Sequence, residues 1–200
     1  MKNIAVLGST GSIGRQTLEV VRKHTNKFKV TSLSAYSDCD LLLEQAIEFC
    51  PEVICLTNST KAPKIKDRLP DGCQIVTGPD ASLIAASWET SEIVVNGISG
   101  IAGMKPLLAS LKSGKTVALA NKESIVCGQP LVKEALKFGG CIIPVDSEQS
   151  AIYQCLCAGK KSEVSRLILT ASGGPFREYT KEMLKNVRAE QALSHPTWNM

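Results

Sequence analysis

Short apolar segments alternate with longer amphipathic segments through the first three quarters of the chain. The apolar segments predict strands at 3–8, 28–35, 52–56, 73–78, 92–99, 115–120 and 141–146. The segments between them predict helices at 13–24, 40–50, 60–69, 80–88, 104–114 and 130–140. Strands that are apolar on both faces usually pair in parallel, with helices covering both sides of the sheet. The pattern therefore predicts a doubly wound, mostly parallel α/β sheet.

The alternation changes after Asp146. The sequence beyond it predicts a helix at 147–161, a long strand at 163–172 and then shorter irregular pieces. We therefore expect a first domain at 1–148 and the beginning of a second, α+β domain at 149–200. The second region is short for an independent hydrophobic core.

Charge and composition narrow the range of functions. The net charge of +4 comes from scattered Lys and Arg without a basic run, which argues against nucleic acid and suits a small anionic ligand. No apolar run approaches the roughly 20 residues of a membrane span, and the first residues predict a strand in place of a leader peptide. We expect a cytoplasmic protein with no membrane association.

The eight cysteines and two histidines could suggest a disulfide framework or a zinc site. However, the cysteines are scattered and no C-x-x-C pair occurs. Several of them lie within apolar runs, among them Cys50, Cys55, Cys73 and Cys141. Buried, reduced thiols are therefore the better interpretation.

Three glycines, Gly8, Gly11 and Gly14, lie between the first predicted strand and the first predicted helix. In a dinucleotide-binding loop the first glycine permits a tight turn and the second lets the backbone approach the pyrophosphate. The third lets helix and strand pack closely, and the helix N-terminus faces the phosphates. The motif predicts dinucleotide binding by a Rossmann-like sheet. The alternative is a glycine-rich turn that only packs.

Two polar clusters follow later strands, "ANKES" at 120–124 and "VDSE" at 145–148. Ligands of doubly wound sheets bind outside the carboxyl ends of the strands, so we expect these clusters near the glycine loop. Asn121 and Glu123 could equally cap a helix. Asp146 and Glu148 could form a solvated turn, a helix start or a metal site.

Five motifs in this order resemble the 1-deoxy-D-xylulose 5-phosphate reductoisomerase family: "GSTGSIG", "ANKES", "VDSE", "SGGPFRE" and "HPTWNM". The resemblance covers the whole chain, and the second and third motifs are its most specific part. It implies an NADPH-dependent, divalent-metal-dependent enzyme that converts a small phosphorylated sugar to 2-C-methyl-D-erythritol 4-phosphate for isoprenoid precursors. It also implies a homodimer, with the second domain catalytic.

The resemblance implies roles for individual residues. The cofactor would be bound by Thr10, Gly11, Ser12, Ile13, Asn121 and Glu123. Mg or Mn would be bound by Asp146 and Glu148. The substrate would be contacted by Lys122, Ser147, Glu148, Ser172, His195 and Trp198, of which Lys122, Glu148 and His195 would be catalytic. His195 and Trp198 would belong to a flap over the substrate. A histidine at a helix end and a docked surface aromatic are their alternatives.

The chain departs from the family in the stretch Tyr36-Ser37-Asp38. The family usually has a basic residue there, which suits the 2′-phosphate of NADPH, and Asp38 would permit some use of NADH. The acid expected near Ser34 for NAD is also absent, which favours NADP. Hydroxyls of Ser34, Tyr36 or Ser37 could replace the basic residue.

The 200-residue chain also lacks phosphate-binding residues and a further Glu ligand that the family has beyond this length. Two carboxylates alone bind Mg weakly, so we expect little or no turnover from this chain alone. Two other functions remain open, a cofactor-binding module and another oxidoreductase such as a semialdehyde dehydrogenase using Cys127 and His195. A Y-x-x-x-K epimerase is excluded, because no tyrosine is followed by lysine at that spacing.

Overall fold

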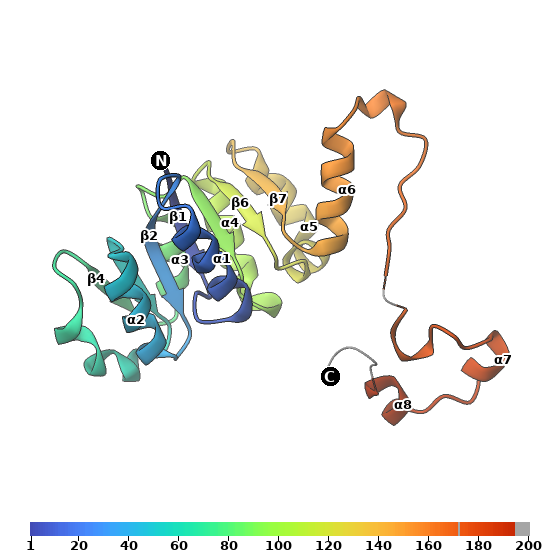
Figure 1. Cartoon of the computed structure of the whole chain (residues 1–200), viewed down its shortest axis with the longest axis horizontal. Coiled ribbons are helices and arrows are strands. Elements are labelled where there is room, and N and C mark those ends of the chain that lie inside the picture. The colour runs from blue at the N-terminus through green and yellow to red at the C-terminus, as the bar shows by residue number, and fades with distance from the viewer. Residues whose placement is uncertain (172, 195–200) are drawn as a thin grey trace. The chain divides into compact units, whose positions relative to one another are not determined.

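Seven parallel strands form a single sheet (Figure 1). The computed structural model describes residues 1–171 and 173–194. The strands lie in the order β4-β3-β2-β1-β5-β6-β7, and each of the six neighbouring pairs is parallel. Their bounds are β1 Lys2–Leu7, β2 Phe28–Ala35, β3 Val53–Leu56, β4 Gln74–Thr77, β5 Ile93–Asn96, β6 Thr116–Leu119 and β7 Cys141–Pro144. The predicted parallel α/β sheet is confirmed.

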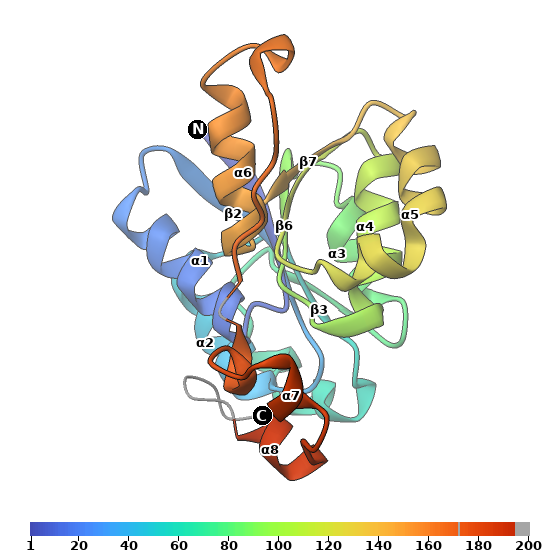
Figure 2. The same cartoon turned by 90° about the vertical axis from the view of Figure 1, so that its right-hand side faces the viewer.

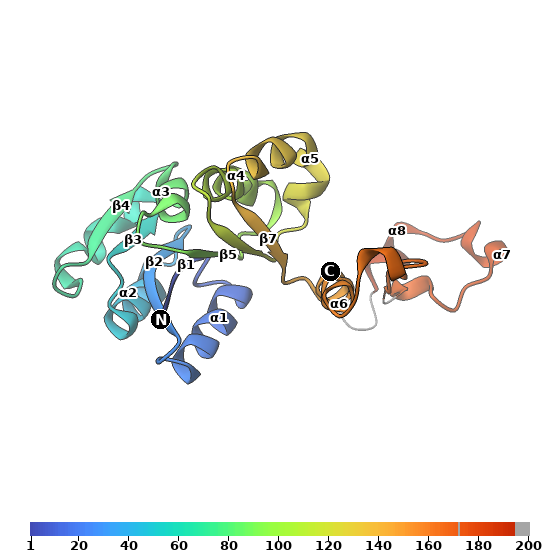
Figure 3. The ribbon, with the colours of Figure 1, turned by 90° about the horizontal axis from the view of Figure 1, so that it is seen from above.

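Helices cover both faces of this sheet (Figures 2 and 3). One face carries α1 (Ser12–Lys23) and α2 (Cys39–Phe49), and the other carries α3 (Ala81–Ser87), α4 (Met104–Lys112) and α5 (Glu123–Leu136). Short 3-10 turns complete this part of the chain: η1 Ser59–Lys64, η2 Lys66–Arg68 and η3 Gly100–Gly103. Both faces of the strands are therefore covered, which explains their nearly continuous apolar sequence.

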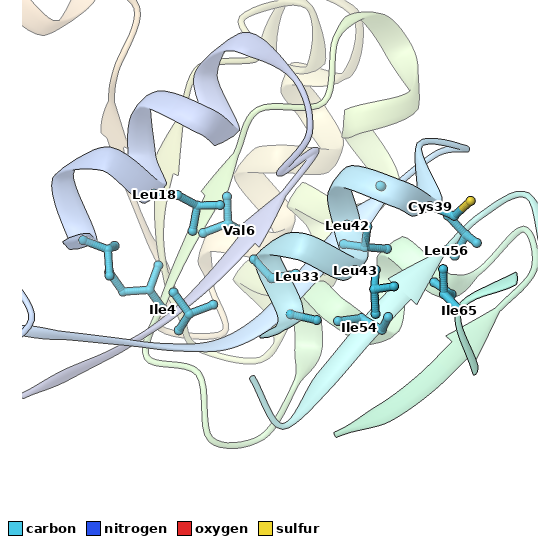
Figure 4. Packing of buried hydrophobic residues seen from close by; sticks show 14 of the residues in the cluster. Ile4, Val6, Leu18, Leu33, Cys39, Leu42, Leu43, Ile54, Leu56 and Ile65 are labelled. Atoms are coloured by element: carbon cyan, nitrogen blue, oxygen red, sulfur yellow. The ribbon is translucent and has the colours of Figure 1, made fainter. Parts of the chain in front are cut away.

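The face under α1 and α2 is packed with aliphatic side chains (Figure 4). Leu33 of β2, Leu42 of α2 and Ile54 of β3 are completely buried there. Helix α1 contributes Leu18 and Val21. The sequence pattern predicts Ile13, Thr17, Val20 and Val21 on the inward face of this helix. The prediction is wrong at one position, because Val20 is 51% exposed while Leu18 is buried. Residues three apart in an α-helix lie on the same face, and Leu18 and Val21 are such a pair.

A second cluster fills the opposite face. Its buried members are Leu7, Val53 and Val117 of the sheet together with helix residues such as Leu107 and Ala85. Alanines are frequent here, with Ala81, Ala85 and Ala86 of α3 all buried. Small side chains allow α3 to lie close to the sheet, where it contacts β1, β2 and β3.

The strand order reverses between β1 and β5. The chain places β2, β3 and β4 on one side of β1 and then returns to place β5, β6 and β7 on the other. Leu7 at the end of β1 pairs with Asn96 at the end of β5. The connections leaving the two strands diverge at this point, which is where doubly wound sheets form a ligand-binding crevice.

Two predicted helices differ from those observed. The helix predicted at 60–69 is replaced by the 3-10 turns η1 and η2, because Pro63 lies inside η1 and cannot donate an α-helical hydrogen bond. The helix predicted at 130–140 begins earlier, at Glu123. Gly128 interrupts it with non-helical angles (φ −125°, ψ 22°), which accommodates Pro130 in the following turn.

The strand predicted at 163–172 is wrong for its described part. Residues 164–171 have no regular secondary structure. A strand exists only through hydrogen bonds to a neighbouring strand, and none is formed by these residues. Their apolar side chains are exposed, with Leu167, Ile168 and Leu169 between 63% and 65% accessible.

The thiols are less buried than predicted. All eight cysteines are free, but only Cys39 and Cys55 are buried. Cys50 is exposed because it adopts a left-handed conformation (φ 44°) at the end of α2, and Cys141 is exposed on the edge strand β7. Burial raises the pKa of the Cys55 thiol to about 12.

The chain divides into two compact units, Met1–Tyr153 and Gln154–Met200. The division falls inside α6 (Ser147–Cys157), whereas we predict a domain boundary at 148/149. The second unit contains η4 (Lys161–Glu163), η5 (Gly174–Phe176), α7 (Lys181–Leu184) and α8 (Ala189–Leu193). Phe176 and Tyr179 stack edge to face within it, with ring centroids 5.2 Å apart. Among the described residues, no helix is long and apolar enough to cross a membrane.

Candidate functional site

The glycine loop connects β1 to α1 at the point where the strand order reverses. Gly8 has φ +69°, a left-handed conformation that favours glycine, and a Cβ atom there would lie 3.2 Å from the carbonyl oxygen of Gly97. A Cβ on Gly14 would collide with the backbone of Gly8 and Ser9. Backbone atoms cannot move aside as a flexible side chain can, so Gly14 is required for the close packing of α1 on the loop.

Hydrogen bonds from β2 and α2 hold the loop in place. Ser9 donates its N–H to the carbonyl oxygen of Ser34 (2.8 Å), and Gly8 donates to the Ser34 hydroxyl (3.3 Å). Gln45 of α2 donates its side-chain amide to the Ser9 carbonyl oxygen (2.9 Å). Ser9 and Gln45 are both buried. The loop is therefore fixed to β2 and α2 before any ligand is bound.

A groove of about 640 Å³ runs along the carboxyl edge of the sheet beside this loop. It is formed by the ends of β1, β2, β3 and β5 and by the first turns of α3 and α4. Its lining residues are Gly8, Thr10, Gly11, Ser34, Ala35, Tyr36, Thr57, Pro79, Asp80, Ser82, Leu83, Gly97, Ile98, Ser99, Ile101, Ala102, Met104, Lys105 and Pro106. The volume is within the range of small-molecule sites.

Of the four loop residues predicted to bind the cofactor, two line the groove. Thr10 and Gly11 are among its lining residues, whereas Ser12 and Ile13 are not. Ser12 accepts a hydrogen bond from Gln16 one turn further along α1 (3.0 Å). Ile13 packs against Gly97, whose Cβ would lie 3.2 Å from that of Ile13.

The chain segment after β5 is a part of the groove that we do not predict from sequence. Gly97, Ile98 and Ser99 line it, followed by Ile101 and Ala102. The glycine-rich sequence "NGISGIAG" was a usable signal, because glycines after a buried strand often mark a close backbone approach. The sequence pattern predicts a strand at 92–99, whereas β5 ends at Asn96.

Asp38 does not line the groove. It is the N-cap of α2, and its carboxylate accepts the N–H of Leu41 (3.2 Å). Tyr36 does line the groove and is 73% exposed. The charged side chains among the lining residues are Asp80 and Lys105. Asp38 is the acid that would favour NADH near the end of β2. Its carboxylate instead caps α2.

Asn121 is almost completely buried, and its side chain bonds to protein at both ends. Its amide donates to the carbonyl oxygens of Ile98 and Gly100, the latter at 2.6 Å. Its oxygen accepts from the backbone and hydroxyl of Ser124, with the backbone N–H at 2.9 Å. This is the capping geometry that we offer as the alternative for Asn121. Contact with a cofactor stays a prediction for Asn121 and for Glu123, which is exposed in the first turn of α5.

Lys122 and Asp146 form an ion pair, although they are far apart in sequence. The Lys122 Nζ lies 3.0 Å from Oδ1 of Asp146. The two residues follow the neighbouring strands β6 and β7, and Val145 extends the pairing by donating to the Leu119 carbonyl oxygen (2.9 Å). The hydrogen bond and charge of Asp146 hold the pKa of Lys122 above its ordinary value.

The second carboxylate oxygen of Asp146 is a buried acceptor. Oδ2 has no hydrogen-bond partner in the part of the chain that the structure describes, and the same is true of Oε1 of Gln149. Glu148 and Ser147 lie beside them in the first turn of α6. An unpaired buried carboxylate oxygen fits a cation, since hard cations prefer oxygen ligands. No cluster of three or more His, Cys, Asp or Glu is found in the described ranges, so the fit rests on Asp146 and Glu148.

Three predicted substrate residues, Ser172, His195 and Trp198, lie outside the described residues. Their roles stay predictions.

Family models match almost the whole chain. Residues 4–129 match 1-deoxy-D-xylulose 5-phosphate reductoisomerase, and residues 142–200 match the C-terminal domain of the same enzyme. The reductoisomerase of Protochlamydia amoebophila is 45% identical over 201 residues, with 100% of this chain and 52% of that protein covered. That of Thermomicrobium roseum is 46% identical over 199 residues, with 98% of this chain and 50% of that protein covered.

Solved structures agree with the family models. A reductoisomerase crystallised with NADPH, fosmidomycin and magnesium is 37% identical, with a TM-score of 0.82 over 100% of this chain and 52% of that chain. The Zymomonas mobilis enzyme in complex with NADPH is 35% identical, with a TM-score of 0.87 over 98% of this chain and 52% of that chain. The chain spans about half the length of the curated relatives that it matches. It belongs to the 1-deoxy-D-xylulose 5-phosphate reductoisomerase family.

Proposed function

We propose that this protein functions in the NADPH-dependent and divalent-metal-dependent conversion of 1-deoxy-D-xylulose 5-phosphate to 2-C-methyl-D-erythritol 4-phosphate. The observation that carries the proposal is the family match over both parts of the chain. The groove beside the glycine loop would hold the cofactor, and the free carboxylate oxygen of Asp146 would bind the metal. Relatives crystallised with NADPH and with magnesium support the same assignment.

The groove would hold NADPH along the carboxyl edge of the sheet. Thr10 and Gly11 would contact the pyrophosphate directly, and the first amides of α1 at Ser12 and Ile13 would complete its binding. Asn121 and Glu123 would lie toward the nicotinamide. NADPH would supply the hydride that reduces the rearranged substrate.

Asp146 and Glu148 would bind Mg or Mn. The cation, when bound, would stabilise negative charge on substrate oxygens during rearrangement. Lys122, whose side chain is half-exposed beside Asp146, would contact the substrate, and Ser147 would hold one of its oxygens. Ser172, His195 and Trp198 would bind the phosphorylated substrate and exclude water from it.

Cofactor binding can be tested with an added charge. Gly11→Asp places a carboxylate in the groove at ordinary backbone angles (φ −78°). We expect NADPH affinity, measured by calorimetric titration, to fall at least about tenfold, because the new charge opposes the pyrophosphate. Gln129→Asp adds the same charge on the exposed surface of α5 and is the control. Equal NADPH affinity in Gly11→Asp and the parent chain would contradict the assignment of this groove.

Titration with NADH compares the two cofactors in the same experiment. Because Asp38 caps α2, we expect it not to favour NADH. Lys105, which lines the groove, would be the cation that contacts the extra phosphate. NADPH should therefore bind more tightly than NADH. Equal affinities would support the use of both cofactors.

A pure cofactor-binding module is the second candidate for this chain, because Asp146 and Glu148, within the described ranges, are fewer ligands than Mg²⁺ prefers. It predicts NADPH binding without metal binding or turnover. Assay of the purified chain with substrate, NADPH and Mg²⁺ decides whether turnover occurs. The semialdehyde dehydrogenase alternative is overturned by the family match.

We also propose a cytoplasmic homodimer for the whole enzyme, on the basis of the family alone. Sedimentation velocity measures the association state directly. A monomer at micromolar concentration would contradict a stable dimer.

A further inference from the structure

The carboxylate of Asp146 has two oxygens in different situations. Oδ1 accepts the ammonium of Lys122 at 3.0 Å, whereas Oδ2 is buried and receives no donor within the described residues. Leaving a charged oxygen buried and unpaired is costly, so such an atom in a folded protein calls for a partner such as a water molecule or a cation. The free atom is therefore the one available to a cation.

The ion pair fixes the direction of that free oxygen. A carboxylate rotates about the bond to its neighbouring carbon, and a hydrogen bond to one oxygen removes this freedom. Lys122 bonds only Oδ1. The other oxygen is consequently held in one orientation, where it accepts no hydrogen bond from the described residues.

The backbone that carries Lys122 is itself held firmly. The preceding residue, Asn121, is buried and bonded to Ile98, Gly100 and Ser124. On the other side, Asp146 follows the β6–β7 pairing through Val145. The two side chains therefore meet through elements with little freedom to separate.

The positive charge of Lys122 opposes a cation nearby, but solvent weakens this effect. The Lys122 side chain is 54% exposed, so water screens its charge. Its orienting effect depends on the hydrogen bond to Oδ1. This bond stops the rotation of the Asp146 carboxylate, which metal binding would otherwise have to stop. The orientation of Asp146 should therefore favour metal binding more than the charge of Lys122 opposes it.

We propose that Lys122 is a positioning residue for metal binding, holding Asp146 through Oδ1 so that Oδ2 faces the divalent cation. The inference rests on the proposed metal site and goes beyond it, because it assigns Lys122 a role before substrate is present.

Direct measurement of Mn²⁺ affinity tests this inference without activity. Free Mn²⁺ is followed by electron paramagnetic resonance during titration of the purified 200-residue chain. In Lys122→Gln we expect affinity to fall about tenfold to a hundredfold, the usual effect of losing a partner of a metal ligand. Lys122→Arg keeps a donor and should restore most of the affinity. Lys137→Gln is the control. It breaks an exposed ion pair with Glu134 at the other end of α5 and should leave Mn²⁺ affinity unchanged.

Asp146→Asn separates the two proposals. Loss of Mn²⁺ binding in this variant supports the metal site, and the Lys122 variants then test positioning alone. If Lys122→Gln binds Mn²⁺ as tightly as the parent chain, the positioning role is wrong. If it binds Mn²⁺ more tightly, the role is wrong and Lys122 competes with the cation. If Asp146→Asn binds Mn²⁺ like the parent chain, the metal site itself is wrong and the inference falls with it.

Discussion

Residues 1–153 and 154–194 use apolar side chains in different ways. The first region buries two aliphatic clusters on the two faces of a parallel sheet. In the second, none of the described side chains is fully buried, even in the apolar run Leu167-Ile168-Leu169. Similar residues are therefore buried in one region and exposed in the other. An apolar run becomes a core strand only when neighbouring strands and a covering helix are present to bury it.

Thiol reactivity should show the largest difference between the two regions. Cys55 is buried with its pKa raised to about 12, whereas Cys157 is exposed. At pH 8 we expect iodoacetamide to modify Cys157 at least about a thousandfold faster, because Cys55 reacts only when the sheet opens. Mass spectrometry of timed samples measures both rates. Rapid modification of Cys55 in the folded chain would contradict a closed core.

Replacing leucine by alanine tests the contrast between buried and exposed apolar residues through the free energy of unfolding. Leu107→Ala removes a completely buried side chain and should cost about 2–5 kcal/mol of unfolding free energy. Leu169→Ala removes one that is 63% exposed and should change it by less than about 0.5 kcal/mol. Urea denaturation followed by circular dichroism gives both values. A comparable cost at Leu169 would mean that residues 164–171 are buried in solution.

Glycine substitution sharpens the comparison within the first region. The Cβ of Gly14→Ala would meet the backbone of the glycine loop, and we expect a loss of about 1–3 kcal/mol. Gly11→Ala is the matched control, because its Cβ would come no closer than 3.3 Å to the Gly8 oxygen. Thermal denaturation compares the two variants. Equal melting temperatures would show that the loop relaxes around Gly14→Ala.

Removal of the Glu52 carboxylate should give a small, pH-dependent effect on the free energy of unfolding. It accepts hydrogen bonds from Thr90 (2.6 Å) and Trp88 (2.9 Å), which hold its pKa below the ordinary carboxyl value, with Lys29 nearby. A lowered folded pKa contributes stability that is present above the unfolded pKa and is lost as pH falls through the folded pKa.

We therefore expect Glu52→Gln to cost about 1 kcal/mol at pH 7 and progressively less below pH 4.5. Urea denaturation at several pH values measures this dependence. Glu134→Gln alters an exposed pair and should show no comparable trend. A cost independent of pH would assign the effect of Glu52 to packing.

The sequence pattern was sufficient for the sheet of the first region and for its glycine loop. Strand–helix alternation predicted all seven strands, and the spacing of Gly8, Gly11 and Gly14 predicted a close backbone approach that the structure contains. These features depend on residues that are near each other in sequence. Periodicity and glycine spacing report such local requirements directly.

Other features required the tertiary structure. Lys122 and Asp146 are 24 residues apart, and no local pattern indicates that one carboxylate oxygen is bonded and the other is not. The capping role of Asp38, the burial of Asn121 and the presence of Asp80 and Lys105 in the groove were likewise not indicated by the sequence. The physical reason is that strand order, not sequence spacing, decides which strand ends become neighbours, and the site is built from those ends.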